Sequence, residues 1–123
     1  MALHNDIGHW GENLATDYLT AQGYAIVERN WHNHRMEIDI IAMKDDMLVV
    51  CEVKTRSEKG DDPLDAIDNK KILSMVRAAE AYVRIKDLPH QVRFDLFAIS
   101  GTPDDYVFEH VPDAFYPPLR TYN

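Results

Sequence analysis

The sequence contains a single cysteine, Cys51, among 123 residues. A lone cysteine cannot form a disulfide within the chain, and its place in an apolar run is typical of a buried side chain in a reducing compartment. No apolar run approaches the roughly 20 residues that span a bilayer. The first residues also lack the basic and apolar stretches of a secretion signal. We therefore expect a cytoplasmic protein with no membrane contact.

Basic residues are also few. Only 13 lysines and arginines stand against 21 aspartates and glutamates, which gives a net charge of -8. This balance argues against the broad basic surface of a nonspecific DNA-binding protein. It is compatible with a nuclease, because the carboxylates of a metal site add negative charge that a bound cation offsets.

Hydrophobic residues make up 46% of the chain, which is enough for a core, and the length suits one domain. We expect a single domain over residues 1–111. An irregular C-terminal tail should follow over residues 112–123, because this stretch contains Pro117-Pro118.

The spacing of apolar residues predicts two helices and five strands, in the order helix, three strands, helix, two strands. The first three strands are separated by short polar breaks and should form an antiparallel meander. The helices are expected at 5–22 and from 65 or 69 to 85, the strands at 24–31, 36–43, 47–54, 92–99 and 106–111, the turns at 32–34, 44–46 and 101–105, and a loop at 57–63. This order predicts an α/β fold with a central mixed sheet flanked by helices.

The third predicted strand changes character along one face. Because side chains alternate with a period of two, Leu48 and Val50 share a face with Glu52 and Lys54. An apolar face thus becomes charged at the end of the strand. On the preceding strand Asp39 lies between isoleucines, where an unpaired carboxylate would be costly, and normal hairpin pairing would bring it near Glu52.

Two neighbouring carboxylates suggest a divalent cation, because like charges repel unless something positive lies between them. Mg²⁺ takes oxygen ligands, which Asp39, Glu52 and the backbone carbonyl of Val53 would supply. Glu12 on the first helix would reach the metal directly or through water. Lys54 would orient the attacking water and offset charge in the transition state of phosphodiester hydrolysis.

Several readings stay open at this stage. A Glu-x-Lys pattern on a strand is often only a solvated ion pair. His32 and His34 could belong to a zinc site, but no set of cysteines accompanies them, so a hairpin turn is the favoured interpretation. Cys51 should face away from the charged site and into the core. Arg93 and Asp95 share a strand face and form either a structural ion pair or, through Arg93, a phosphate contact.

Three basic residues are candidates for contact with nucleic acid. Arg56 begins the polar loop that follows Lys54, and Lys70 lies at the start of the second helix. Arg93 is the third candidate. Loops beside a catalytic strand are common places for substrate contact.

Five segments, in their order along the chain, carry a resemblance to a known family. They are Gly8–Ala15, Glu37–Ala42, Cys51–Arg56, Lys70-Lys71 and Arg93–Asp95. Together they resemble the YraN family, an uncharacterised bacterial family with the restriction-endonuclease-like fold that is similar to archaeal Holliday-junction resolvases. The resemblance covers nearly the whole chain. One departure is Met36, where the family usually has glycine.

The resemblance implies an α-β-β-β-α-β core and a nuclease motif made of Asp39, Glu52 and Lys54, with Glu12 as the acid on the helix. It also implies dependence on Mg²⁺ or Mn²⁺ and a branched or otherwise structured DNA substrate. Because junction resolvases act as two-fold dimers, the analogy suggests a homodimer.

Three functions therefore remain open. The first is a Mg²⁺-dependent endonuclease acting on DNA, at junctions or flaps. The second is a noncatalytic nucleic-acid-binding module with a nuclease-like fold that acts in repair, recombination or DNA uptake, which the acidic charge favours. The third is a protein in which the acidic cluster only stabilises the fold. Metal binding separates the first from the third, and cleavage separates the first from the second.

Overall fold

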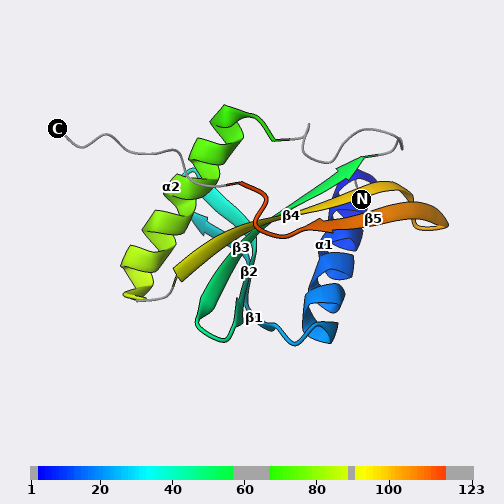
Figure 1. Ribbon diagram of the computed structural model, residues 1–123. Coiled ribbons are helices and arrows are strands. Elements are labelled where there is room, and N and C mark those ends of the chain that lie inside the picture. The colour runs from blue at the N-terminus through cyan, green and yellow to red at the C-terminus, as the bar shows by residue number, and fades with distance from the viewer. Residues whose placement is uncertain (1–2, 57–66, 89–90, 116–123) are drawn as a thin grey trace.

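The computed structural model describes residues 3–56, 67–88 and 91–115, with side chains from residue 9 onward in the first stretch (Figure 1). The elements are α1 (Leu3–Ala21), β1 (Ala25–Asn33), β2 (Met36–Lys44), β3 (Met47–Arg56), α2 (Asn69–Lys86), β4 (Gln91–Thr102) and β5 (Asp105–Val111). This order confirms the predicted α/β class and its α-β-β-β-α-β core.

All five strands form one mixed sheet in the order β1-β2-β3-β4-β5. The first three are an antiparallel meander, as predicted. β4 then lies parallel to β3, and β5 returns antiparallel beside β4. Parallel neighbours need a long crossover, which here contains α2. The parallel register places Glu52 beside Leu96.

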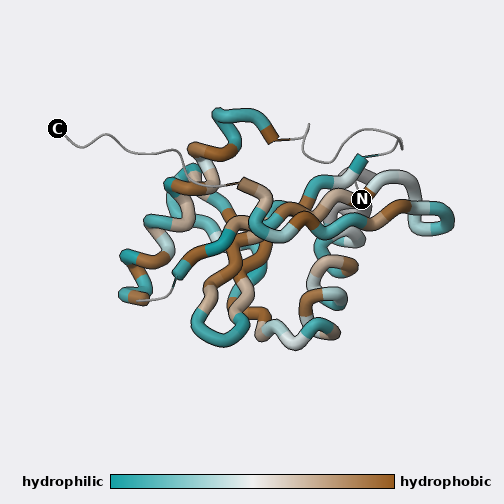
Figure 2. The backbone as a smooth tube through the Cα atoms, viewed as in Figure 1, coloured by the Kyte–Doolittle hydropathy of each residue, from teal (hydrophilic) through white to brown (hydrophobic). Residues whose placement is uncertain are grey.

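The two helices cover opposite faces of the sheet, and successive residues of the central strands pack against different helices. Val50 packs in a cluster with Tyr82 of α2, whereas Val49 and Cys51 pack in a second cluster with Leu19 of α1. Figure 2 shows the hydrophobic residues gathered along these central strands. Cys51 is 1% exposed, which confirms the prediction that it faces the core.

The two hairpin turns of the meander are tighter than the sequence suggested. The predicted turn at 32–34 was wrong for His32 and Asn33, which extend β1, and the chain reverses at His34-Arg35. The second turn consists of Asp45-Asp46. His34 has φ 56° and Asp45 has φ 55°, the left-handed conformation that two-residue hairpins favour and that His and Asp tolerate.

Met36 pairs with Asn33 directly after the first of these turns. Its side chain packs beside the cluster under α2. The hairpin therefore closes in a regular way with methionine at this position.

The β4–β5 hairpin is longer than predicted. β4 extends through Gly101 to Thr102, because Gly101 pairs with Tyr106 of β5. The turn is Pro103-Asp104 rather than all of 101–105. Gly101 has φ 113°, and a Cβ there would lie 2.3 Å from the carbonyl oxygen of Asp105, so only glycine fits.

Helix α2 has well-formed ends. The side chain of Asp68 caps the start by accepting a hydrogen bond from the Lys71 backbone N–H at 2.8 Å. Asp87 ends the helix in the left-handed conformation, with φ 52°. The buried residues of α2 include Met75, Val76 and Tyr82.

Residues 112–115 form no helix or strand but still pack on the sheet. The Ala114 N–H donates to the carbonyl of Phe94 at 2.7 Å, and the Phe115 ring stacks on Phe94 with centroids 5.0 Å apart. The rest of the predicted tail and the predicted loop at 57–63 lie outside the described residues. Within the described part of the chain, neither helix has the length and apolar character needed to cross a membrane.

Candidate active site

The candidate site lies where β2 and β3 part. Their ladder ends at the pair Ile40–Cys51, so Asp39 and Glu52 are the next residues on the two strands. The Val53 backbone N–H donates to Asp39 Oδ2 at 2.9 Å. This bond fixes the Asp39 carboxylate against β3 after the regular pairing has stopped.

Asp39 is the most perturbed acid of this site. Burial raises its pKa from 3.8 to about 7, and the negative charges of Glu52 and Glu12 add to the rise. The hydrogen bond from Val53 acts in the opposite direction but is outweighed. An acid held in this way favours a proton or a cation beside it. Three carboxylates from β2, β3 and α1 therefore act on one another at this point.

Glu12 lies on α1, and two residues of β1 contact its carboxylate. Its Oε1 accepts a hydrogen bond from Asn30 Nδ2 at 2.9 Å and lies 3.7 Å from Arg29 Nη2. Asn30 lies between the pairs Arg29–Ile40 and Trp31–Ile38, so it is alongside Asp39, and its φ of 53° is left-handed inside a strand. Sequence reasoning missed Arg29 and Asn30; asparagine's tolerance of this conformation was the one local signal.

Gly11 explains how Glu12 comes so close to the sheet. A Cβ at Gly11 would lie 2.4 Å from Cγ2 of Thr55 and 3.3 Å from Cδ1 of Ile99. Only a residue without a side chain lets α1 approach the end of β3 and the neighbouring strand at this distance. The close packing at Gly11 thus places the next residue, Glu12, at the candidate site.

The carboxylate of Glu52 forms an ion pair with a lysine. Lys71 Nζ, on α2, lies 3.2 Å from Glu52 Oε2. The two side chains are 38% and 16% exposed. The sequence marked the pair Lys70-Lys71 through the family resemblance, but only Lys70 was selected as a candidate contact.

A cavity of about 330 Å³ opens beside this ion pair, between the end of β3 and the start of α2. Its walls include Glu52, Lys54 and Lys70, so the structure brings these three predicted residues together. Arg56 ends β3 one residue beyond Thr55 and pairs in register with Ser100.

Arg93 lies at the other end of the sheet. It pairs with Val49, near the start of β3, whereas Leu96 is the residue beside Glu52. Its Nε and Nη2 both donate to the Asp95 carboxylate at 2.8 Å, and Nη2 also reaches the Tyr24 hydroxyl at 2.8 Å. Of the two readings of Arg93, the geometry is that of the structural ion pair.

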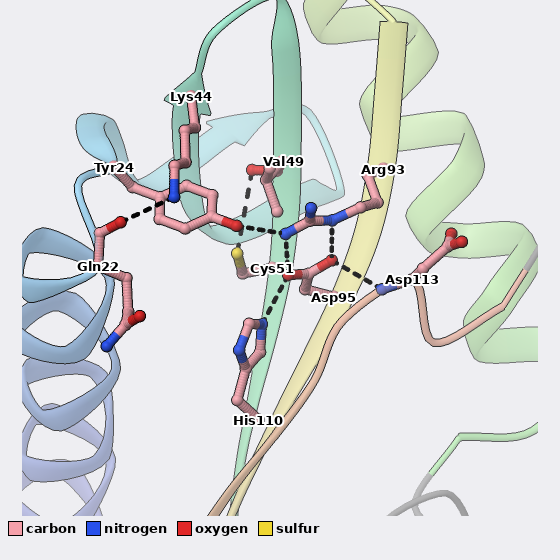
Figure 3. A network of polar contacts seen from close by, with 9 residues as sticks. All are labelled: Gln22, Tyr24, Lys44, Val49, Cys51, Arg93, Asp95, His110 and Asp113. Carbon is pink, nitrogen blue, oxygen red and sulfur yellow. Dashed lines mark hydrogen bonds and ion pairs between the residues drawn. The ribbon is translucent and has the colours of Figure 1, made fainter.

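Asp95 is the centre of a buried polar network (Figure 3). Besides Arg93, it bonds His110 Nε2 at 2.7 Å and accepts from the Asp113 N–H at 3.0 Å. Burial alone would raise the pKa of Asp95, but the hydrogen bonds from His110, Arg93 and Asp113 outweigh it and hold the pKa below 3.8. The network joins β4, β5 and the chain that follows them. A hollow of about 680 Å³ lies beside Arg93 and Tyr24, apart from the carboxylate site.

The donor set at the carboxylate site has the chemistry of a magnesium ligand set. Asp39 and Glu52 offer carboxylate oxygens, and Val53, which the prediction named for its carbonyl, is in direct contact with Asp39. Mg²⁺ usually takes one or two carboxylates and completes its shell with waters and substrate oxygens.

The described residues do not form a metal site closed by protein side chains alone. Across the described ranges 9–56, 67–88 and 91–115, no group of three or more His, Cys, Asp or Glu side chains could hold an ion by itself. The zinc reading of His32 gains no support, because its ring nitrogens bond the carbonyl of Asn30 and the carboxylate of Glu37.

Comparison with known proteins shows the family of this chain. A family model described as "Uncharacterised protein family UPF0102" matches residues 11–99, and the chain belongs to this family, which is the YraN family of the predicted resemblance. A UPF0102 protein of Parabacteroides distasonis is 47% identical over 98% of this chain and 100% of its own length. Others from Bacteroides thetaiotaomicron and Flavobacterium psychrophilum are each 44% identical, over 97% and 94% of this chain and 99% and 98% of theirs.

Proposed function

We propose that this protein is a metal-dependent endonuclease that hydrolyses phosphodiester bonds of DNA, with branched or structured DNA as its preferred substrate. The observation that carries the proposal is the meeting of Asp39 and Glu52 where β2 and β3 part, with Lys54 on the wall of the cavity that Glu52 also lines. The preference for branched DNA comes from the resemblance to junction resolvases.

Asp39, Glu52 and the Val53 carbonyl would hold Mg²⁺ or Mn²⁺, with Glu12 close enough to act on Asp39 electrostatically. The cation supplies Lewis-acid polarisation of the scissile phosphate. The Val53 N–H keeps the Asp39 carboxylate in one orientation, which favours ligand binding because little rotational freedom is then lost.

Lys54 contributes positive charge from the protein itself. It follows Glu52 by two residues, so both side chains leave the same face of β3, and both line the 330 Å³ cavity. An ammonium group here orients the attacking water and offsets the charge that develops on the phosphate oxygens. Lys70 and Arg56 would extend contact along the nucleic-acid backbone.

A noncatalytic nucleic-acid-binding module is the second candidate. The net charge of -8 favours it, because weak general attraction to DNA leaves recognition to partners or to special DNA structures. Such a module would keep the carboxylates as a fold element and would act in repair, recombination or DNA uptake.

The partner and compartment follow from the same proposal. A four-way junction has two-fold symmetry, which a homodimer would match with one active site for each cleaved strand. The buried, unpaired Cys51 supports a reducing, cytoplasmic setting. Light scattering with and without junction DNA measures the oligomeric state directly.

The decisive experiment is cleavage of labelled duplex, single strand, flap and four-way junction DNA with Mg²⁺, Mn²⁺ or EDTA. Glu52→Gln and Lys54→Met should each lower the rate by at least about 100-fold, because each removes a group used in the transition state. Lys86→Gln removes one exposed charge at the other end of α2 and should leave the rate unchanged.

Metal-dependent cleavage that both site variants abolish would support the endonuclease. DNA binding by a folded protein without cleavage of any substrate would favour the binding module. A folded protein that shows neither cleavage nor calorimetric binding of Mg²⁺ contradicts the assignment of the site.

A further inference from the structure

The charges around the carboxylate site are unevenly neutralised. Glu12 has Arg29 at 3.7 Å, and Glu52 has Lys71 at 3.2 Å. The hydrogen-bond donor that reaches Asp39 at 2.9 Å is a neutral backbone N–H. Lys71 thus lies against Glu52, which is one of the two carboxylates that a divalent cation would use.

The contact between Lys71 and Glu52 is of a kind that exchanges easily. Lys71 is 38% exposed, and ion pairs with this access to water contribute little stability, because each charge is also well solvated on its own. A lysine ammonium sits on a flexible four-carbon stem, so it can change partners without movement of the helix.

The cavity beside Lys71 is where the ammonium could go. Lys54, Lys70 and Lys71 all line it. The volume is about 330 Å³. Two acids also line it, but Asp68 is occupied in capping α2 and Glu52 is paired with Lys71. Three lysines against two acids that already have partners leave a net positive charge around one open volume, which suits an anion with several oxygens.

We propose that this cavity binds a phosphate group of the nucleic-acid backbone through Lys54, Lys70 and Lys71. We further propose that Lys71 is an exchangeable counter-ion, which leaves Glu52 for that phosphate when a divalent cation binds Glu52. The exchange rests on the proposed metal-dependent function. The phosphate site does not require cleavage.

One substitution separates this role from a structural one. Lys71→Gln removes the cation that competes at Glu52, so Mg²⁺ should bind about threefold to tenfold more tightly. The same change removes one positive charge from the cavity wall and leaves the Glu52 carboxylate without its counter-ion, so inorganic phosphate should bind at least about threefold more weakly even in EDTA. A lysine that merely braced Glu52 would, when removed, leave Mg²⁺ binding weaker or unchanged.

Calorimetry of the intact protein measures both quantities, with Mg²⁺ alone in one titration and inorganic phosphate in EDTA in the other. Lys70→Gln should weaken phosphate binding and leave Mg²⁺ binding within about twofold, because Lys70 is not paired with Glu52 in the structure. Lys86→Gln, on the last turn of α2, should alter neither. Titration with oligothymidylate in EDTA, followed by competition with phosphate, tests whether the backbone of nucleic acid is the source.

Each failure has its own meaning. Wild-type protein that binds Mg²⁺ but shows no tighter binding in Lys71→Gln overturns the exchange while leaving the proposed endonuclease intact. Phosphate binding that is absent, or equal in wild type and the lysine variants, overturns the phosphate site. Wild-type protein that binds phosphate but not Mg²⁺ overturns the exchange and the proposed metal dependence together.

Discussion

Asp39 accepts a hydrogen bond from the Val53 N–H at 2.9 Å, one step beyond the last regular pair of β2 and β3. This contact keeps two separating strands connected through a side chain. It also brings the Asp39 carboxylate within the electrostatic reach of Glu52 and Glu12. The fold therefore maintains an arrangement of like charges that is unfavourable without a proton or cation.

Asp39→Asn should stabilise the protein at alkaline pH. The pKa of Asp39 is 3.8 in the unfolded chain and about 7 when folded, so the folded state binds more protons between these values. The stability contribution of Asp39 is thus lost as pH rises through about 7. Removing the charge should increase the free energy of unfolding by on the order of 2 kcal/mol at pH 8 and by little near pH 4.

Urea denaturation at both pH values measures this difference. Asparagine keeps an oxygen for the Val53 N–H, whereas Asp39→Ala also removes the acceptor and should gain less. Equal or lower stability of Asp39→Asn at pH 8 would contradict the account of charge repulsion. Both variants should lose Mg²⁺ binding in calorimetry.

Asp95→Asn should destabilise the protein by about 3 kcal/mol, because it leaves Arg93 without its carboxylate in a buried network. The pKa of Asp95 is lowered by folding, so its stabilising effect is present above pH 3.8 and is lost as pH falls further. Thermal unfolding between pH 3 and 7 should show a steeper acid loss in wild type than in Asp95→Asn. Asp104→Asn, in the exposed β4–β5 turn, is the matched control.

Gly11→Ala should destabilise the protein by about 1 to 3 kcal/mol, because the new Cβ would overlap Cγ2 of Thr55. In an exposed helix the same change would be stabilising. Thr55→Ser removes that methyl group, so the double variant should recover most of the loss in denaturant titrations. If the double variant is no more stable than Gly11→Ala, the close approach of α1 to β3 is not the cause of the destabilisation.

Asn30→Asp should lower the stability of the protein, because it removes the hydrogen bond to the Glu12 carboxylate. Aspartate tolerates the left-handed backbone of residue 30, but it replaces the amide that donates to Glu12 Oε1 with a second carboxylate. A loss of about 1 to 2 kcal/mol is expected from the unmatched pair. Asn30→Gly keeps the backbone conformation without the repulsion and should lose less. The order of the two free energies of unfolding is the measurement, and the reverse order would contradict the contact.

The main elements and part of the site could be predicted from the sequence. Alternation along residues 47–54 put Glu52 and Lys54 on one face, and the spacing of apolar residues predicted the second helix. The hairpin turns were misplaced by a residue or two, because left-handed His34 and Asp45 let the strands pair closer to the reversal than polarity suggests. Those errors did not disturb the pairing of the meander.

The residues that neutralise the site could not be predicted in the same way. Lys71 meets Glu52 only because α2 crosses back over the sheet, and Arg29 meets Glu12 only because α1 packs against β1. The choice between the two readings of Arg93 also depended on Tyr24, which comes from a distant part of the chain and accepts a hydrogen bond from the guanidinium that binds Asp95.

The sequence by itself determined which side chains share a face of a strand or helix, because that follows from the backbone period. It thereby determined the order of the elements and the charged end of β3. Only the tertiary structure decided which element lies opposite each face, since those contacts join residues far apart in the chain. The partners of Glu12, Glu52 and Asp95 belong to this second group, and they set the charge balance of the candidate site and of the buried network.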